Sequence, residues 1–110
     1  MDVNSTTENF TRRALWAQID LDAAAHNMRV IRRHVGPDVR IAAVVKANAY
    51  GHGAVELART FAENGADCFA VSSLDEAVEL RRYAGITKNI FILGHTDGRR
   101  TEELLAYHIE

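Results

Sequence analysis

Apolar positions in the first part of the chain change their spacing at Leu21. Apolar residues occupy every second position of LWAQIDLD, the period-2 pattern of a β-strand over residues 15–21. In the next stretch, LDAAAHNMRVIRRHVG, they recur three and four positions apart, as on one face of a helix. Gly36 and Pro37 are typical of a helix end. The sequence therefore predicts a strand over residues 15–21 and then a helix over residues 21–35.

Three later segments are apolar without any alternation. They read IAAVV at residues 41–45, CFAV at residues 68–71 and IFIL at residues 90–93, the last of which ends at Gly94. A continuous short apolar run is typical of a strand that is covered on both of its faces, as in a parallel sheet. We therefore expect three buried strands here.

Helical patterns separate and follow these runs. The segment at residues 54–65, AVELARTFAENG, gathers its apolar residues on one face and ends in an Asn-Gly pair. The segment at residues 73–85 opens with Ser73 and Glu76 in the spacing of a capping box. A further helix is expected over residues 97–108. Strands that alternate with helices indicate parallel pairing through helical crossovers, the α/β class.

Two α/β architectures fit this order, an open doubly wound sheet and a (β/α)8 TIM-type barrel. A barrel needs eight units and roughly 250 residues, whereas this chain has 110 residues and about three βα units. If the fold is a barrel, the chain is its N-terminal portion. Residues 1–13 are polar and are expected to form a flexible tail, which leaves residues 14–110 for the domain.

Composition narrows the functional classes. The 13 basic residues nearly balance the 15 acidic ones, so no charge surplus points to nucleic acid. The single cysteine, Cys68, lies in an apolar run and is expected to be a buried thiol in a reducing compartment. No apolar stretch has the length of a secretory signal or a membrane span. The expected location is cytoplasmic.

Lys46 directly follows the apolar run at residues 41–45. In parallel α/β folds this carboxyl end of a strand is where active sites lie. The residues that follow, ANAYGHG, are mostly small and leave room for a flat group, while Tyr50 offers a hydroxyl to an anion such as a phosphate. Desolvation favours a neutral amine, which can form a Schiff base with an aldehyde such as pyridoxal phosphate. The alternative is a rim lysine whose charge reaches water.

The sequence resembles that of alanine racemases over about residues 15–95. The resemblance is carried by AVVKANAYGHG, WAQIDLDAAAHN, ENGADCFAVSSLDEAVELR and IFILG. It implies that Lys46 holds pyridoxal 5'-phosphate as a Schiff base and acts as the catalytic base on the D-alanine side. It also implies that Tyr50 binds the cofactor phosphate and that Leu93 lies near the cofactor, although strand-end packing is an equal interpretation for Leu93.

The resemblance further implies partners outside this chain. Alanine racemases are homodimers that interconvert L- and D-alanine and supply D-alanine for peptidoglycan, and their second base is a tyrosine from the partner's C-terminal β-domain. The first strand, around residues 16–21, pairs in that family with the same β-domain. We therefore expect the isolated chain to be inactive and marginally stable, with an exposed strand edge and an uncovered apolar face.

Other interpretations stay open at the level of the sequence. The substrate preference could be that of a broad-specificity or serine racemase, and a non-catalytic pyridoxal phosphate carrier or a basic amino-acid decarboxylase has a related fold. An interaction domain is a further alternative. We expect His52 to organise its loop, and the Glu102–Glu103 pair to be a solvated face. No metal-ligand spacing connects the remaining histidines, which are His26, His34, His95 and His108.

Overall fold

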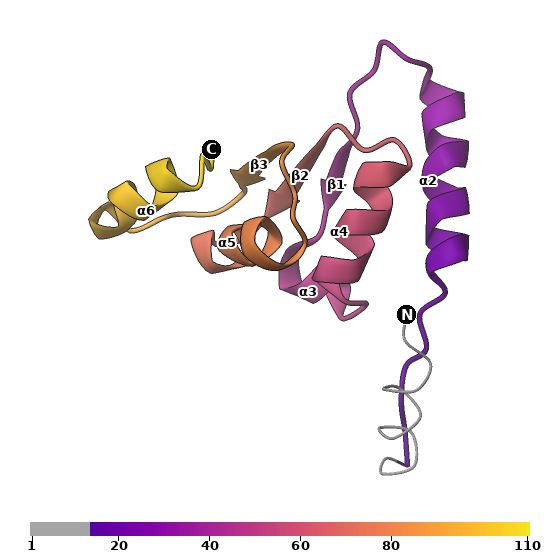
Figure 1. Ribbon diagram of the computed structural model, residues 1–110, viewed down its shortest axis with the longest axis horizontal. Coiled ribbons are helices and arrows are strands. Elements are labelled where there is room, and N and C mark those ends of the chain that lie inside the picture. Colours follow the sequence, from indigo (N-terminus) through magenta and orange to yellow (C-terminus); the bar gives the residue numbers. More distant parts are fainter. Residues whose placement is uncertain (1–13) are drawn as a thin grey trace.

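The computed structural model describes residues 14–110, so the tail predicted for residues 1–13 lies outside the described part of the chain. Its centre is a sheet of three parallel strands in the order β1-β2-β3. The strands span Ala42–Val44 (β1), Cys68–Val71 (β2) and Asn89–Ile92 (β3), and helices connect them (Figure 1). The predicted α/β class with parallel strands is confirmed.

The strand bounds follow the apolar runs closely. β2 has the predicted bounds, β1 is one residue shorter at each end, and β3 begins and ends one residue earlier than predicted. Ala42, Cys68 and Asn89 are level with one another across the sheet. Because the strands are parallel and in register, their carboxyl ends meet at one edge.

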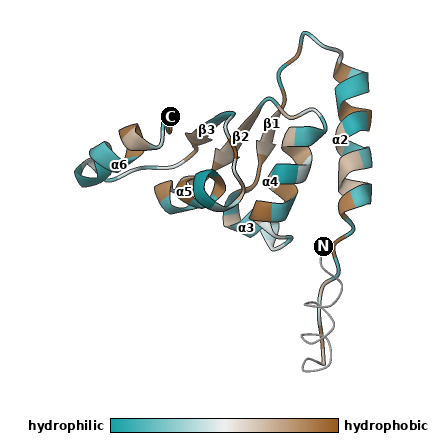
Figure 2. Cartoon of the chain, viewed as in Figure 1, coloured by the Kyte–Doolittle hydropathy of each residue, from teal (hydrophilic) through white to brown (hydrophobic). Residues whose placement is uncertain are grey.

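Helices α4 (Ala54–Glu63) and α5 (Leu74–Tyr83) pack with the sheet around one hydrophobic core. Both begin and end close to the predicted positions. Figure 2 shows hydrophobic colours on the strands and a mixture of hydrophobic and polar colours on the surrounding helices. The largest fully buried side chains come from β2, β3, α5 and the position directly after β1, and they are Phe69, Leu80, Ile90, Val45 and Val71.

The other face of the sheet is open at β1, which corrects the prediction that this strand is covered on both faces. Ala42 and Val44 point away from the core and are exposed, Val44 by 40%. Cys68 and Ala70 share that face but are buried, because β2 has a strand on each side whereas β1 is at the edge. The expected burial of the Cys68 thiol is confirmed.

Helix α2 (Leu21–Val35) confirms the predicted helix and packs beside α4 (Figure 1). The Asp20 side chain caps it by accepting from the Ala23 N–H at 3.1 Å, and Gly36 ends it with a φ of 81°. Met28 is its buried residue. Although α2 has 15 residues, no helix in the described range combines the length and apolar character needed to cross a membrane.

The strand predicted for residues 15–21 is wrong for this chain. Residues 15–20 form no regular element, and Leu21 already belongs to α2. A strand exists through hydrogen bonds to a neighbouring strand, and this segment precedes α2 on the side of the molecule away from the sheet (Figure 1). Alternating apolar residues alone therefore did not create a strand. Leu15 remains 86% exposed.

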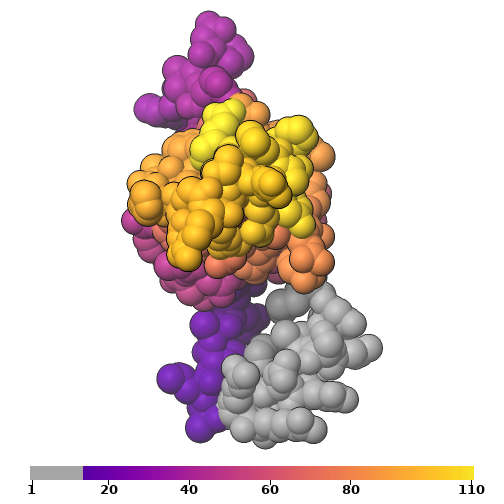
Figure 3. All heavy atoms as spheres, turned by 90° about the vertical axis from the view of Figure 1, so that its left-hand side faces the viewer, coloured from indigo at the N-terminus to yellow at the C-terminus, as the bar shows by residue number. Residues whose placement is uncertain are grey.

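The segment after β3 returns to the sheet. A 3-10 turn, η1 (Gly98–Arg100), leads into α6 (Thr101–Ala106), which is shorter than the predicted helix over residues 97–108. Ile109 then bridges Ile90 in parallel, and Ile92 donates to the Glu110 carbonyl at 2.7 Å. Figure 3 shows α6 and the residues after it, in yellow, along one side of the molecule.

Arginine side chains tie together the loops at the amino ends of the strands. Arg32 donates to the Gly65 carbonyl at 2.7 Å and forms an ion pair with Asp67. Asp67 also accepts from the Ile41 N–H at 2.7 Å, just before β1. Arg81 similarly bonds four backbone carbonyls, those of Ile86, Lys88, Tyr107 and His108. These contacts stabilise the amino edge of the sheet. The opposite, carboxyl edge is where a site is expected in such folds.

Candidate active site

The carboxyl ends of the three strands lie side by side. The Val45 N–H donates to the Ala70 carbonyl at 2.9 Å, and the Leu93 N–H donates to the Val71 carbonyl at 2.8 Å. Lys46 and Leu93 therefore leave the same edge of the sheet, separated by two strand spacings, about 10 Å. The structure places the predicted lysine and leucine where the sequence put them, at strand ends.

Lys46 stands between a buried and an exposed environment. Its neighbour Val45 is only 1% exposed, whereas Lys46 itself is half-buried. Within residues 14–110 its amine forms no hydrogen bond and no ion pair, unlike Lys88, whose Nζ donates to the Ala62 carbonyl at 2.9 Å and to the Ala66 carbonyl at 2.5 Å. Of the two lysine amines in the described residues, only that of Lys46 is without a hydrogen bond or ion pair.

A left-handed helical turn follows Lys46. Helix α3 (Lys46–Tyr50) contains Ala47, Asn48, Ala49 and Tyr50 with φ between 51° and 56°. Left-handed backbone costs a residue with a Cβ roughly 1–2 kcal/mol, so four in succession cost on the order of 4–8 kcal/mol before compensating bonds are counted. Strain of this kind is concentrated at functional sites. The sequence indicated a glycine loop here, not a strained turn of non-glycine residues.

Hydrogen bonds within the loop compensate part of this cost. The Ala49 N–H donates to the Val45 carbonyl at 3.0 Å, the spacing of a helical turn. The Gly53 N–H donates to the Asn48 carbonyl at 2.9 Å, and the Asn48 side chain accepts from Ala54. His52 Nδ1 lies 3.0 Å from the Ala49 carbonyl oxygen, in agreement with the expected role of His52 in organising the loop.

Glu76 was not identified from the sequence as a residue of this site. It was expected to complete a capping box with Ser73, and the Ser73 hydroxyl does accept from the Glu76 N–H at 3.2 Å. Its carboxylate, however, accepts from the Ala47 N–H at 2.7 Å through Oε2, and from the Ser72 N–H at 2.7 Å and hydroxyl at 2.6 Å through Oε1. The capping-box spacing showed that Glu76 begins a helix but not where its side chain would point.

The charge of Glu76 is stabilised by these contacts. Burial by itself would raise the pKa of Glu76, but the hydrogen bonds from Ser72 and Ala47 outweigh burial and place that pKa below its ordinary value. Glu76 is therefore an ionised acceptor at neutral pH. Hydrogen bonds to a charged acceptor are stronger than those between neutral groups, so this carboxylate is a firm connection between the ends of β1 and β2.

Tyr50 and Leu93 are both open to solvent. Tyr50 is 60% exposed and Leu93 is 54% exposed. No hydrogen bond joins the Tyr50 hydroxyl to Lys46 in the described part of the chain, so the turn brings the two residues to one edge without pairing them. Both side chains are available to a group that binds there.

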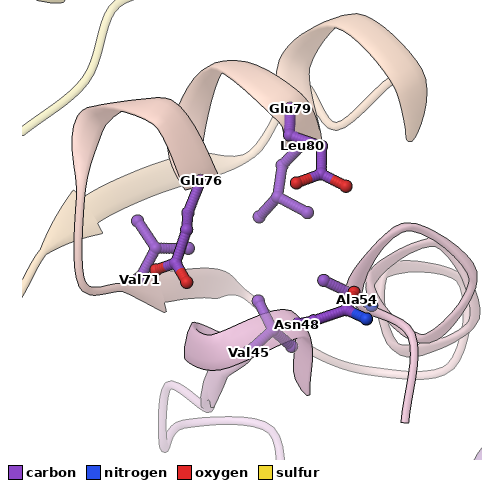
Figure 4. Close-up of a pocket in the computed structure, with 7 residues that line it drawn as sticks. All are labelled: Val45, Asn48, Ala54, Val71, Glu76, Glu79 and Leu80. Carbon is purple, nitrogen blue, oxygen red and sulfur yellow. Dashed lines mark hydrogen bonds between the residues drawn. The ribbon is translucent and has the colours of Figure 1, made fainter. Parts of the chain in front are cut away.

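A cavity of about 300 Å³ lies behind the turn, between α3, α4 and α5 (Figure 4). Figure 4 shows the Glu76 carboxylate directed toward α3 and the Asn48 side chain directed toward Ala54. Lys46, Tyr50 and Leu93 do not line this cavity, whose lining residues are Val45, Asn48, Ala54, Val71, Glu76, Glu79 and Leu80. No cluster of three or more His, Cys, Asp or Glu within residues 14–110 is arranged to hold a metal ion.

These features define a parallel α/β domain with a free lysine at the carboxyl edge of its first strand. The family profile described as alanine racemase, N-terminal domain, matches residues 19–110. The chain belongs to the alanine racemase family, and its three parallel strands match the N-terminal portion of that family's barrel domain.

Individual relatives agree with this assignment. An alanine racemase of Clostridium perfringens strain SM101 is 54% identical over 98 residues, which cover 89% of this chain and 25% of the relative. The crystal structure of the Bacillus anthracis alanine racemase with bound L-Ala-P has a TM-score of 0.78 and 40% identity, covering 87% of this chain and 26% of that one.

The alanine racemase of Bartonella henselae with covalently bound pyridoxal phosphate gives a TM-score of 0.73 at 33% identity, covering 83% of this chain and 25% of that one. The chain thus spans about a quarter of the length of the relatives that it matches.

Proposed function

We propose that residues 14–110 form the N-terminal part of the barrel domain of a pyridoxal phosphate-dependent alanine racemase, and that Lys46 is the residue to which the cofactor is attached. The observation that carries this proposal is the free amine of Lys46 at the carboxyl edge of β1, in a chain 54% identical to an alanine racemase. The proposed reaction is the interconversion of L- and D-alanine, which supplies D-alanine for peptidoglycan.

The residues at this edge fit pyridoxal phosphate by their chemistry. A primary amine without a competing hydrogen bond is what an aldehyde requires. A Cβ added at Gly51 or Gly53 would meet no atom within 4 Å, so the loop after Lys46 leaves open space at these two glycines. Tyr50 supplies an exposed hydroxyl for a phosphate, and Leu93 supplies an apolar surface at the end of β3.

When it is bound, pyridoxal phosphate serves as an electron sink that makes the Cα proton of an amino acid removable. Lys46 has two proposed roles: its Nζ would hold the cofactor through its aldehyde, and as a free amine the same Nζ would accept or return the Cα proton of the substrate. Tyr50 is proposed to orient the group by donating to its phosphate. The backbone of the left-handed turn fixes where Lys46 leaves the sheet.

Inversion at Cα requires proton removal from one face and proton return to the other. Lys46 occupies one side of the reacting carbon and can serve one face only. A second base is therefore needed, and we propose that it is the tyrosine of a partner subunit's C-terminal β-domain, in a homodimer. This requirement also explains why the isolated chain is expected to be inactive.

The attachment of the cofactor can be tested on the chain itself, because it contains two lysines, Lys46 and Lys88. The folded protein is mixed with pyridoxal phosphate, reduced with borohydride and digested, and the labelled peptides are identified by mass spectrometry. We expect the label on Lys46, with Lys88 protected by its two carbonyl bonds. Lys46→Arg should remove the label while keeping the charge. Label confined to Lys88 or the amino terminus would overturn the assignment.

Racemisation can be tested in a chimera. Residues 19–110 replace the matching segment of the Clostridium perfringens relative, and turnover of L-alanine and L-serine is measured by chiral chromatography. We expect racemisation of alanine in the chimera and none in its Lys46→Arg form. Faster turnover of serine would favour the alternative of a serine racemase, and attachment of the cofactor without any turnover would favour a carrier protein.

A further inference from the structure

The Glu76 carboxylate crosses from the start of α5 to the residue that follows Lys46. Within one side chain it joins the first residue after β2, Ser72, to the first residue of the left-handed turn, Ala47. The backbone N–H of Ser73 is the usual target of a glutamate at this position of a helix. The side chain thus reaches the turn with one oxygen and Ser72, just before its own helix, with the other.

The Ala47 N–H does not need Glu76 for its hydrogen bond. Ala47 is exposed, so water could satisfy the same donor. Water cannot, however, fix the orientation of the Ala47 N–H. A carboxylate that is itself held by the Ser72 N–H and hydroxyl provides an acceptor whose position is set by the sheet and by α5.

The orientation of the Ala47 N–H matters because this group belongs to the peptide bond that joins Ala47 to Lys46. Four residues from Ala47 onward are held in a left-handed conformation that they disfavour. A turn under such strain relaxes unless contacts from outside define it. Glu76 is the outside contact on the lysine side of the turn, whereas the Asn48 side chain and carbonyl hold its far side.

We propose that Glu76 is a positioning residue for Lys46: by holding the Ala47 N–H it fixes the start of the left-handed turn and thereby the direction in which the lysine amine leaves β1. Its chemical consequence rests on the proposed attachment of pyridoxal phosphate to Lys46. The structural part of the proposal, that the Glu76 carboxylate holds the turn, does not depend on the cofactor.

The structural part is tested by amide hydrogen exchange in the unmodified 110-residue chain. Ala47 should be protected although it is exposed, and Glu76→Ala should remove that protection. Glu79→Gln is the matched control, because Glu79 lines the same cavity on the same helix and accepts no hydrogen bond in the described part of the chain (Figure 4). An Ala47 amide that exchanges at the rate of an unstructured peptide in the unmodified chain would overturn the proposal.

The chemical part is tested by the ratio of borohydride-trapped label on Lys46 to that on Lys88. Loss of a hydrogen bond to a charged acceptor is worth roughly tenfold or more in population. We expect Glu76→Ala to lower labelling of Lys46 by about this factor, Glu76→Gln to lower it less, since one acceptor oxygen remains, and Glu79→Gln to leave it unchanged.

Labelling of Lys88 separates positioning from general loss of structure. Unfolding would break the Lys88 bonds to Ala62 and Ala66 and raise its labelling, whereas loss of positioning lowers Lys46 alone. If Glu76→Ala unfolds by this criterion, Glu76→Gln carries the comparison. Unchanged labelling of Lys46 in a folded Glu76 variant would overturn the proposal. If the unmodified chain does not label Lys46 at all, the cofactor assignment fails, and exchange at Ala47 alone decides whether Glu76 holds the turn.

Discussion

The side-chain oxygen of Asn48 accepts a hydrogen bond from the backbone N–H of Ala54 at 2.9 Å, so that a residue of the left-handed turn caps helix α4. The N-cap position itself is occupied by Gly53, which has no side chain to offer. Asn is also among the residues that best tolerate left-handed backbone. One side chain therefore couples the strained turn beside Lys46 to the helix that packs on the sheet.

Asn48→Ala should destabilise the protein by about 1–2 kcal/mol, because it removes a helix cap and places a less tolerant residue at a φ of 54°. Urea unfolding followed by circular dichroism measures this change. Asn27→Ala is the matched control, since Asn27 is exposed in the middle of α2, and should change the stability by no more than about 0.5 kcal/mol. Equal unfolding midpoints for the two variants would show that Asn48 does not cap α4.

Ala47→Gly should stabilise the protein, in contrast to Asn48→Ala. Ala47 is exposed and has a φ of 51°, so glycine relieves left-handed strain of roughly 1–2 kcal/mol. The greater freedom of glycine in the unfolded chain offsets about 0.5–1 kcal/mol of this gain, which leaves a net stabilisation of about 0–1.5 kcal/mol.

Ala23→Gly provides the comparison for this variant. Ala23 is also exposed but lies in the ordinary helix α2, where glycine should destabilise by about 0.5–1 kcal/mol. Urea unfolding of both variants measures whether each substitution raises or lowers the free energy of unfolding. Destabilisation of similar size in both would show that Ala47 carries no left-handed strain in solution.

Local signals in the sequence explain which elements could be predicted. The Ser73 cap, the Asn64-Gly65 end and the apolar run at residues 68–71 each act over a few neighbours, and the structure places α5, α4 and β2 accordingly. The lysine could be placed at the carboxyl edge for the same reason, because an apolar run that ends in a charge defines the end of a strand. Short-range patterns were sufficient there.

Features that depend on distant partners could not be read from the sequence. Alternation at residues 15–21 resembled a strand, but a strand needs a neighbour to pair with. The left-handed turn contains no glycine between Ala47 and Tyr50, and one of the contacts that define it comes from Glu76, 29 positions away in the chain from Ala47. A capping-box spacing is compatible with either target for that carboxylate.

Acid should weaken the amino edge of the sheet through Asp67. The hydrogen bond from the Ile41 N–H, together with Arg32, lowers the pKa of Asp67 below its ordinary value. A carboxyl group whose pKa is lowered by folding contributes stability at neutral pH, and that contribution is lost as the pH falls below the unfolded-state pKa of about 3.9 and through the folded one. The stabilising contribution of Asp67 should therefore disappear in acid.

The measurement is the difference in urea midpoint between the unmodified chain and Asp67→Asn as a function of pH. We expect a difference at pH near 7 that shrinks toward about pH 3. Asp38→Asn, at an exposed position in the loop before β1, is the control for the loss of one negative charge. A difference for Asp67→Asn that stays constant with pH would mean that its ionised form contributes nothing to folding.

Gly94 is required at the carboxyl edge by lack of space. A Cβ at this position would lie 2.9 Å from the Ser72 carbonyl oxygen, closer than such atoms approach, and a backbone atom cannot move aside as a flexible side chain would. Gly94→Ala should therefore separate the ends of β2 and β3, destabilise the protein by about 1–3 kcal/mol, and lower cofactor labelling of Lys46 because Ser72 also holds Glu76. Gly98→Ala is the control, since a Cβ there meets nothing within 4 Å. Gly98→Ala should leave both the urea midpoint and the labelling ratio unchanged. Equal behaviour of the two variants would show that the close approach at Gly94 does not constrain this edge.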